Sequence, residues 1–112
     1  MRQFVITFIF CVLSASSYSS NYSGKISRVL MGPIYGSTVI IDVEGTPSDR
    51  DACHTNSGYD FAFDGSTEEG KMYLSTILTA YASKMNVNIS GYSSCTVYGG
   101  IENLFHILLQ NN

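Results

Sequence analysis

The segment Tyr59–Lys84 reads YDFAFDGSTEEGKMYLSTILTAYASK and contains the two clearest structural signals of the chain. Aromatic residues alternate with small or acidic ones up to Asp64, which is typical of a half-buried strand. Gly65 ends that strand. Ser66 and Glu69 then form a capping-box pattern with Ser66 as the N-cap. The segment therefore predicts a strand that is followed directly by a helix.

The helix is expected to run from Thr67 to about Lys84. Glu68 and Glu69 suit its positive start, and Lys84 suits its negative end. Several apolar residues recur at helical spacing and predict one buried stripe: Leu74, Ile77, Leu78, Tyr81 and Met85.

Alternating apolar residues predict four further strands on either side of this segment. They are Lys25–Met31 and Thr38–Glu44 before it, and Asn86–Ser90 and Leu104–Leu109 after it, with Cys95–Tyr98 as an optional short strand. In the first of these strands, Ile26, Arg28 and Leu30 are expected on one face. The resulting order is βββαββ. We predict a mainly β fold of the OB type, a five-stranded Greek-key barrel with one helix. A helix lying on an open antiparallel sheet would give the same order.

Composition places the chain among small folded domains. Its 112 residues suit a single domain, and a hydrophobic share of 45% is too high for an intrinsically disordered chain. The formal net charge is -3, and the six basic residues form no cluster. Nucleic acids and anionic lipids are recognised through basic patches, so neither is expected as a partner.

The first residues have the pattern of a secretory signal peptide, which we assign to Met1–Ser17. Arg2 supplies the positive charge, Phe4–Leu13 is an apolar stretch, and small residues follow. Cleavage is expected after Ser17 or one or two residues away. The apolar stretch is too short to cross a bilayer core of about 30 Å as a helix, so no membrane span is expected after cleavage. Residues 18–112 would then form one exported domain, either secreted or periplasmic.

Two cysteines remain once the leader, with Cys11, is removed. An even number of cysteines in an exported chain predicts a disulfide, here Cys53–Cys95. A loop of this length gives about 4 kcal/mol of stabilisation in the chain-entropy treatment. The alternative is a metal pair formed by Cys53 and the adjacent His54, but these residues lack the spacing of a zinc site.

Catalytic residues do not form an adequate set. His54 and His106 are the only histidines, and there is no G-x-S-x-G nucleophile motif. The acidic stretch Asp49-Arg50-Asp51 lacks the ligand spacing of a calcium loop. The sequence therefore predicts a protein that is not an enzyme and that needs neither a cofactor nor a metal.

The chain is rich in tyrosine, with eight residues. Tyrosine offers a ring for stacking and a hydroxyl for hydrogen bonding, which suits both carbohydrates and protein interfaces. Tyr59, Tyr73 and Tyr81 lie in the predicted strand and helix and are expected in the core or in an interface. Tyr92 and Tyr98 lie in turn-rich stretches and are better candidates for ligand contact.

Several segments together resemble one family of small exported bacterial proteins. They are Ala52-Cys53, the Tyr59-Asp60-Phe61 strand with its Asp64-Gly65 exit, the helix GKMYLSTILTAYA, the strand VNISG, Cys95, and the ENLFHI segment. The family includes the binding subunit of subtilase cytotoxin and the typhoid-toxin-type B subunits, and the resemblance covers about residues 22–109. It implies an OB-fold with one disulfide, a homopentameric ring, sialylated or related cell-surface glycans as ligands, and an exported catalytic subunit as partner.

Two stretches match the family's sugar site. Tyr22-Ser23-Gly24 resembles the aromatic-Ser-Gly segment whose serine contacts sialic acid, and Glu44 resembles the acid that ends the second strand. An acid upstream of that serine has no counterpart here, and Ile89-Ser90 stands in place of a tyrosine on the fourth strand. With Tyr92 added, we expect a glycan site at Ser23, Glu44, Tyr22 and Tyr92.

These observations lead to two expected functions. The first is an exported, non-catalytic binding protein that acts as a glycan-binding B-type subunit of an AB5-like toxin assembly. The second is a periplasmic or secreted structural or interaction protein of the same fold without sugar binding. In the second case the chain could also be an inhibitor that acts through the loop Gly45–Gly58.

Overall fold

The computed structural model describes residues 20–110, and the expected signal peptide lies outside this range. Within residues 20–110 the chain forms a mainly β fold with six strands and one long helix. The elements are β1 (Asn21–Gly24), β2 (Ile26–Leu30), a 3-10 turn η1 (Pro33–Tyr35), β3 (Thr38–Val43), β4 (Phe61–Asp64), α1 (Glu68–Ser83), β5 (Asn86–Gly91) and β6 (Glu102–Gln110). Among these residues, no helix has both the length and the hydropathy needed to cross a membrane.

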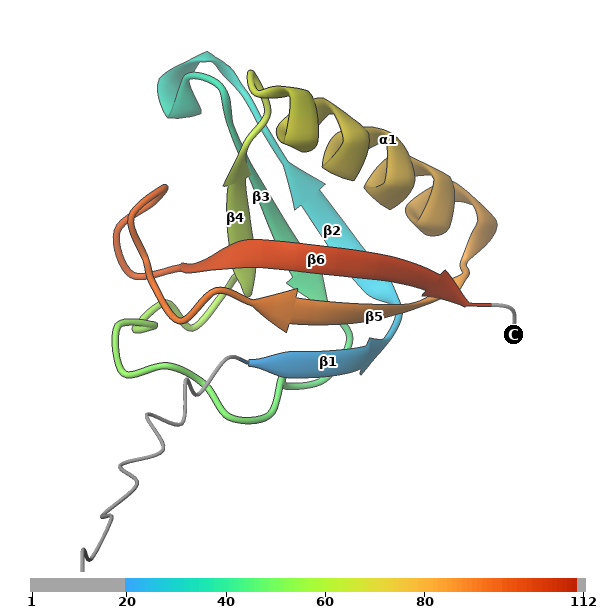
Figure 1. The fold of residues 1–112 in the computed structure, drawn as a ribbon, viewed down its shortest axis with the longest axis horizontal. Coiled ribbons are helices and arrows are strands. Elements are labelled where there is room, and N and C mark those ends of the chain that lie inside the picture. Colours follow the sequence, from blue (N-terminus) through green and yellow to red (C-terminus); the bar gives the residue numbers. More distant parts are fainter. Residues whose placement is uncertain (1–19, 111–112) are drawn as a thin grey trace, which may run out of the picture.

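The six strands form one curled sheet in the order β1-β5-β6-β4-β3-β2 (Figure 1). Neighbouring strands are antiparallel except β4 and β6, which pair in parallel through Phe61 with Glu102 and Ala62 with Asn103. β1 and β2 lie at the two ends of this order, although only Lys25 separates them in the sequence. One short stretch of chain therefore supplies both edges of the sheet.

The five predicted strands are all present, but the described residues contain one strand more than the sequence predicts. The sequence predicts five strands, whereas the described residues form six, because the chain also makes β1. That strand has a single core residue, Tyr22, and so gives no alternating apolar signal. The optional strand Cys95–Tyr98 does not form. Tyr98 makes only an isolated bridge to Ile101.

A β-bulge changes the predicted facing of β2. The pairing with β3 shifts between Ile26 and Arg28, so one extra residue interrupts the alternation. Ile26 and Val29 consequently pack in one core cluster, while Leu30 packs against the other. The prediction that Ile26, Arg28 and Leu30 share one face is therefore wrong.

The helix α1 begins one residue later than the capping-box pattern indicates. Thr67 is the N-cap, and its hydroxyl accepts a hydrogen bond from the backbone N–H of Gly70 at 2.9 Å. Ser66 instead donates its hydroxyl to Asp64 Oδ1 at 2.7 Å, so the prediction of Ser66 as N-cap is wrong. The hydroxyl of Ser66 is thus engaged in the turn after β4, and the hydroxyl of Thr67, nearer the helix, forms the cap.

The buried stripe of α1 is narrower than the spacing predicts. Ile77 is fully buried, as expected, but Leu78 and Tyr81 are 45% and 47% exposed. The helix lies across β2 and β6 and covers the curled sheet along one line (Figure 1). Of the helix residues, Ile77 and the small residue Ala80 are buried in the core, and Tyr73 and Leu74 pack against it while partly exposed.

The core has two parts, one on each face of the sheet. The larger part lies under α1 and contains Phe61, Ile77, Val87 and Ile89 among its members. The smaller part contains Ile40, Ala62 and Ile101, with Tyr35 and Tyr59 packed against them.

The predicted disulfide Cys53–Cys95 is present, with an S–S distance of 2.06 Å and a Cα–Cα distance of 5.9 Å. It joins the loop between β3 and β4 to the connection between β5 and β6. Asn103 shapes the second of these segments, because its amide nitrogen donates to the hydroxyls of Ser94 and Thr96 at 2.8 Å. The disulfide therefore links two long loops at the same end of the sheet.

Candidate functional site

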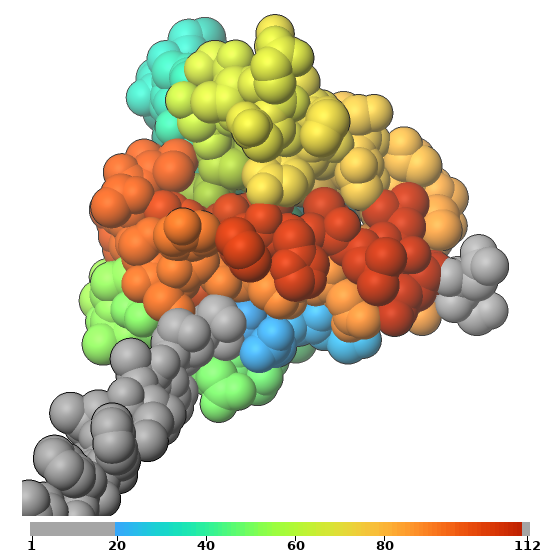
Figure 2. Space-filling view, in the orientation of Figure 1, coloured from blue at the N-terminus to red at the C-terminus, as the bar shows by residue number. Residues whose placement is uncertain are grey.

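A polar hollow lies on the outer face of β1, β5 and β6, and it is the best candidate for a ligand site. These three strands run side by side (Figure 1), and β6 lies between α1 and the other two on the surface shown in Figure 2. The hollow has a volume of about 410 Å³, within the usual range for ligand pockets. Its lining residues are Asn21, Tyr22, Ser23, Ser48, Asn88, Ile89, Ser90, His106 and Leu108.

Strand register arranges most of this lining as two rows. Ser23 pairs with Asn88, and Asn88 pairs with Leu108. In the second row, Asn21 pairs with Ser90, and Ser90 pairs with His106. Successive side chains of a strand point to opposite faces, so Tyr22 and Ile89 turn inward between these rows. The outer face is thereby left with hydroxyl, amide and imidazole groups and with the exposed side chain of Leu108.

Hydrogen bonds order the second row. The Ser90 hydroxyl lies 3.2 Å from Asn21 Oδ1 and 3.3 Å from His106 Nε2. Ser48 forms one wall, because its loop bridges to β1 and its hydroxyl donates to the backbone oxygen of Asn21 at 3.2 Å. Ser23 is exposed on the first row. The hollow is therefore partly pre-organised, with exposed polar groups beside an ordered row.

An aromatic run extends from the hollow. His106 lies 5.7 Å from Phe105 between ring centroids, and Phe105 lies 5.0 Å from Tyr92 in an edge-to-face arrangement. Tyr92 and Phe105 are 59% and 49% exposed. Exposed rings beside a polar hollow offer stacking surfaces for a ligand that also makes hydrogen bonds.

The structure brings some of the predicted sugar-site residues together and separates others. Ser23 lies in the polar hollow, and Tyr92 lies at the far end of the aromatic run. Tyr22 is a core residue, and its hydroxyl lies 2.9 Å from the backbone oxygen of Lys25 and 2.5 Å from that of Glu44. Burial raises the pKa of Tyr22 above its ordinary value, although the hydrogen bond to Lys25 opposes this.

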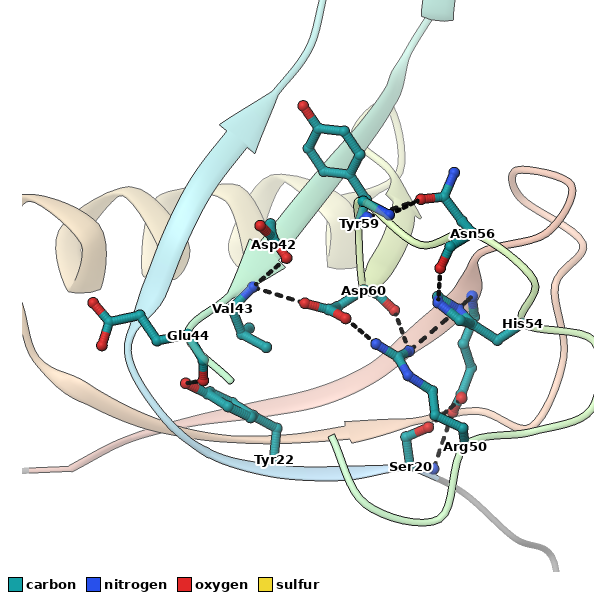
Figure 3. Close-up of polar contacts among 12 residues, drawn as sticks. Ser20, Tyr22, Asp42, Val43, Glu44, Arg50, His54, Asn56, Tyr59 and Asp60 are labelled. Atoms are coloured by element: carbon teal, nitrogen blue, oxygen red, sulfur yellow. Dashed lines mark hydrogen bonds and ion pairs between the residues drawn. The ribbon is translucent and has the colours of Figure 1, made fainter. Parts of the chain in front are cut away.

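Glu44 lies at a second hollow, which we call the helix-end hollow. Its volume is about 580 Å³, and its lining residues are Lys25, Ile26, Ser27, Glu44, Tyr81, Ala82 and Lys84. The Glu44 side chain points away from the polar network drawn in Figure 3. Ser23 and Glu44 thus line two different hollows.

Sequence reasoning missed a buried ionic cluster beneath the loop between β3 and β4 (Figure 3). Arg50 forms an ion pair with Asp60 and donates to the Asp60 backbone oxygen at 2.9 Å. Asp60 and Asp42 both accept from the backbone N–H of Val43, at 2.9 and 3.1 Å. Arg28 pairs with Asp42 at 3.0 Å. Alternation along the strand had placed Asp60 on the solvent side, and only the fold shows that a loop covers it.

The pKa values of the two carboxylates in this cluster, Asp60 and Asp42, are shifted in opposite directions. Burial, reinforced by a hydrogen bond with Asp42, raises the pKa of Asp60 to about 6. Burial alone would also raise the pKa of Asp42, but hydrogen bonds with Asp60 and Arg28 hold it below its usual range. Two carboxylates at one site favour sharing a proton, because both charges together are costly there.

His54 links the ionic cluster to β6. Its Nε2 lies 2.9 Å from the backbone oxygen of Asn56, and its Nδ1 accepts from the backbone N–H of Glu102 at 3.1 Å. Burial and the nearby charge of Arg50 lower the pKa of His54, which favours the neutral ring. These contacts give His54 a structural position in the loop. His106, by contrast, is exposed in the polar hollow.

Metal ligation has little support in the described part of the chain. No group of three or more His, Cys, Asp or Glu side chains in residues 20–110 is arranged to hold a metal ion.

Comparisons with protein-family models, curated proteins and solved structures found no match to this chain. Residues 20–110 define a small, mainly β protein with a curled sheet, one helix, one disulfide and a polar hollow lined without Asp, Glu, Lys or Arg.

Proposed function

We propose that this chain is an exported, non-catalytic binding protein whose polar hollow takes a carbohydrate. One observation carries the proposal: the two outer rows of β1, β5 and β6 present hydroxyl, amide and imidazole groups without an acidic or basic chain of Asp, Glu, Lys or Arg. Asn side chains both donate and accept hydrogen bonds, and serine hydroxyls do the same. This chemistry matches the hydroxyl groups of a sugar better than it matches an ionic ligand.

The apolar groups of the site support the same proposal. Leu108 is 53% exposed in the hollow, and the rings of His106, Phe105 and Tyr92 continue from it. One face of a sugar ring is apolar and packs well on such groups, while its hydroxyls reach the polar row. The resemblance to toxin B subunits adds sialylated or related glycans as the first ligands to test.

We also propose that the curled sheet is a barrel of the OB type. If β1 and β2 count as two halves of one strand bent at Gly24-Lys25, six strands become five, and the strand order returns to its starting strand. A five-stranded Greek-key barrel requires such a return. The short parallel pair of β4 and β6 would then complete the closure.

A glycan array tests the proposed site. The full chain is expressed in an exporting bacterial host, and the exported protein is applied to sialylated and neutral glycans. We expect binding that falls severalfold in Ser23→Ala and in Asn88→Ala, because each removes one hydrogen bond worth about 1 kcal/mol. Both variants keep the strand pairing, which the backbone makes.

Glu44→Gln is the matched control, since it changes an exposed strand-end residue of the helix-end hollow. It should bind as the parent does. Loss of binding in Glu44→Gln with full binding in Ser23→Ala would move the site to the helix-end hollow. An exported protein that binds no glycan would contradict the proposal.

A specific observation supports the second candidate function, an interaction or inhibitor protein. The loop between β3 and β4 is held by the disulfide, by Arg50 with Asp60, and by His54. A loop that is rigid before binding loses little conformational freedom when it docks. The solution mass separates the two: the ring of a B subunit predicts a pentamer by light scattering, whereas an inhibitor needs no assembly.

A further inference from the structure

Ser20 lies directly before β1 and against the carboxylate of Glu102. Both residues are 0% exposed. The Ser20 backbone nitrogen lies 3.1 Å from Glu102 Oε2, and its hydroxyl donates to Oε1. Gly91 makes room for this carboxylate, because a Cβ at that position would lie 1.6 Å from Oε2. The backbone of Gly91 also donates to the Ser20 oxygen at 2.9 Å, which holds Ser20 in place.

The buried carboxylate of Glu102 has donors around it, and the charge of Arg50 acts on it at longer range, but it forms no direct ion pair among residues 20–110. The ion pairs within residues 20–110 join Arg28 to Asp42, Arg50 to Asp60, and Lys71 to Glu68. Within the described residues, the carboxylate accepts hydrogen bonds from the two groups of Ser20 and, at 3.5 Å, from the backbone N–H of Asp51. An ionised carboxylate is costly to bury unless a cation accompanies it. A positive charge on the Ser20 nitrogen would supply that cation at the right place.

We propose that the exported chain is cleaved between Ser19 and Ser20, and that the new α-ammonium group of Ser20 forms an ion pair with Glu102. This inference rests on the proposed export. A signal peptidase would add water across the peptide bond: the hydroxyl goes to the Ser19 carbonyl carbon, and the Ser20 nitrogen takes a proton. The resulting amine, with an ordinary pKa near 8, takes up a second proton and is mostly charged at neutral pH.

The sequence before Ser20 suits this cleavage. Ser19 and Ser17 would be the small residues one and three positions before the cut, as signal peptidases require. The site lies two residues beyond the cleavage after Ser17, which uses Ser17 and Ala15 as its small residues. The two sites can therefore be separated by substitution at Ser19 and at Ala15.

The intact mass of the exported protein provides the first test. The full chain is expressed in an exporting bacterial host, and the mature product is expected to begin at Ser20. Ser19→Leu should abolish this product, while Ala15→Leu should leave it unchanged. A mature product that begins at Tyr18 and disappears in Ala15→Leu would overturn the inference while leaving export intact. A chain that is not exported would overturn both proposals.

Amine labelling of the same product tests the ion pair itself. We expect the Ser20 amine of the folded protein to react with an amine-directed reagent at least tenfold more slowly than after unfolding and reduction. Glu102→Gln should speed this reaction, whereas the exposed Lys71 should label equally in both proteins. Equal labelling of the Ser20 amine in the folded and unfolded protein would overturn the pairing, and this comparison does not depend on any variant.

Discussion

Two regions of the domain, the helix side under α1 and the loop side under the connection between β3 and β4, are held by different physical means. Under α1 the interior is apolar: Ile77 and Val87 are fully buried there and need no polar partners. Under the loop between β3 and β4 the interior is polar, and Arg50, Asp60 and Glu102 are held by ion pairs, backbone contacts and a disulfide. The helix side depends on area removed from water, whereas the loop side depends on matched charges and a covalent bond.

This difference shows how a small domain can cover a sheet with irregular chain. A loop brings its own backbone polar groups into the interior, and each of them needs a partner. The charged side chains meet this need, since Asp60 accepts from Val43 and Arg50 donates to the Asp60 backbone. The disulfide then restricts this loop in the unfolded chain as well.

The largest expected effect comes from removing the disulfide. The paired substitution Cys53→Ser with Cys95→Ser should lower the free energy of unfolding by about 4 kcal/mol, because it frees a long loop in the unfolded chain. Thermal unfolding followed by circular dichroism measures the change. The parent protein under reducing conditions is the control and should match the variant. An unchanged melting temperature would mean that the loop side does not depend on the covalent bond.

Truncation on the helix side should have a somewhat smaller effect. Ile77→Ala removes buried methyl groups between α1 and the sheet and should cost about 3 kcal/mol. Its neighbour Leu78 is 45% exposed, so Leu78→Ala should change stability by less than about 0.5 kcal/mol. Urea unfolding of both variants gives the comparison. Similar losses in the two would mean that the apolar stripe is as wide as its spacing predicts.

The smallest expected effect is a pH dependence of the free energy of unfolding that comes from Asp60 on the loop side. The pKa of Asp60 is raised to about 6 in the folded protein, so the folded state binds its proton more tightly than the unfolded state does. This contribution to stability is fully present below pH 4 and is lost as the pH rises from about 4 to 6. Asp60→Asn should remove that part of the pH dependence.

The pH dependence of stability must be compared between the parent protein and Asp60→Asn, because other groups titrate in the same pH range. The lowered pKa of His54 gives stability that is lost as the pH falls below about 6.5, and the lowered pKa of Asp42 acts in the same direction below pH 4. Asp49→Asn, which changes an exposed acid of the same loop, is the control. A pH profile that Asp60→Asn and Asp49→Asn leave equally unchanged would remove Asp60 from the explanation.

Sequence patterns predicted the helix side far better than the loop side. The helix and the strands β3, β4, β5 and β6 have repeated apolar spacing, and each was located to within a few residues. The disulfide followed from an even cysteine count. These features depend on burial of apolar groups at regular intervals, which a single sequence displays directly.

The missed features depend on contacts between distant residues. Asp60 and Glu102 are charged, so pattern reasoning places them in solvent, yet segments far away in the sequence cover them. The polar hollow was found only in part, through Ser23. Its other groups, such as Asn88 and His106, become neighbours through the register of three strands. The alternating polar residues of Asn86–Ser90 were the one local signal that could have indicated it.

The position of β1 and β2 at opposite edges of the sheet has a consequence for the order of assembly during synthesis. Both strands emerge at nearly the same moment, whether from the ribosome or from the export machinery, but their partners arrive at different times. β3 pairs with β2 after a short turn, whereas β5 pairs with β1 only after the helix has been made. Chains begin to fold as they emerge. β2 can therefore pair as soon as β3 has emerged, whereas β1 keeps an open strand edge until β5 has followed the helix.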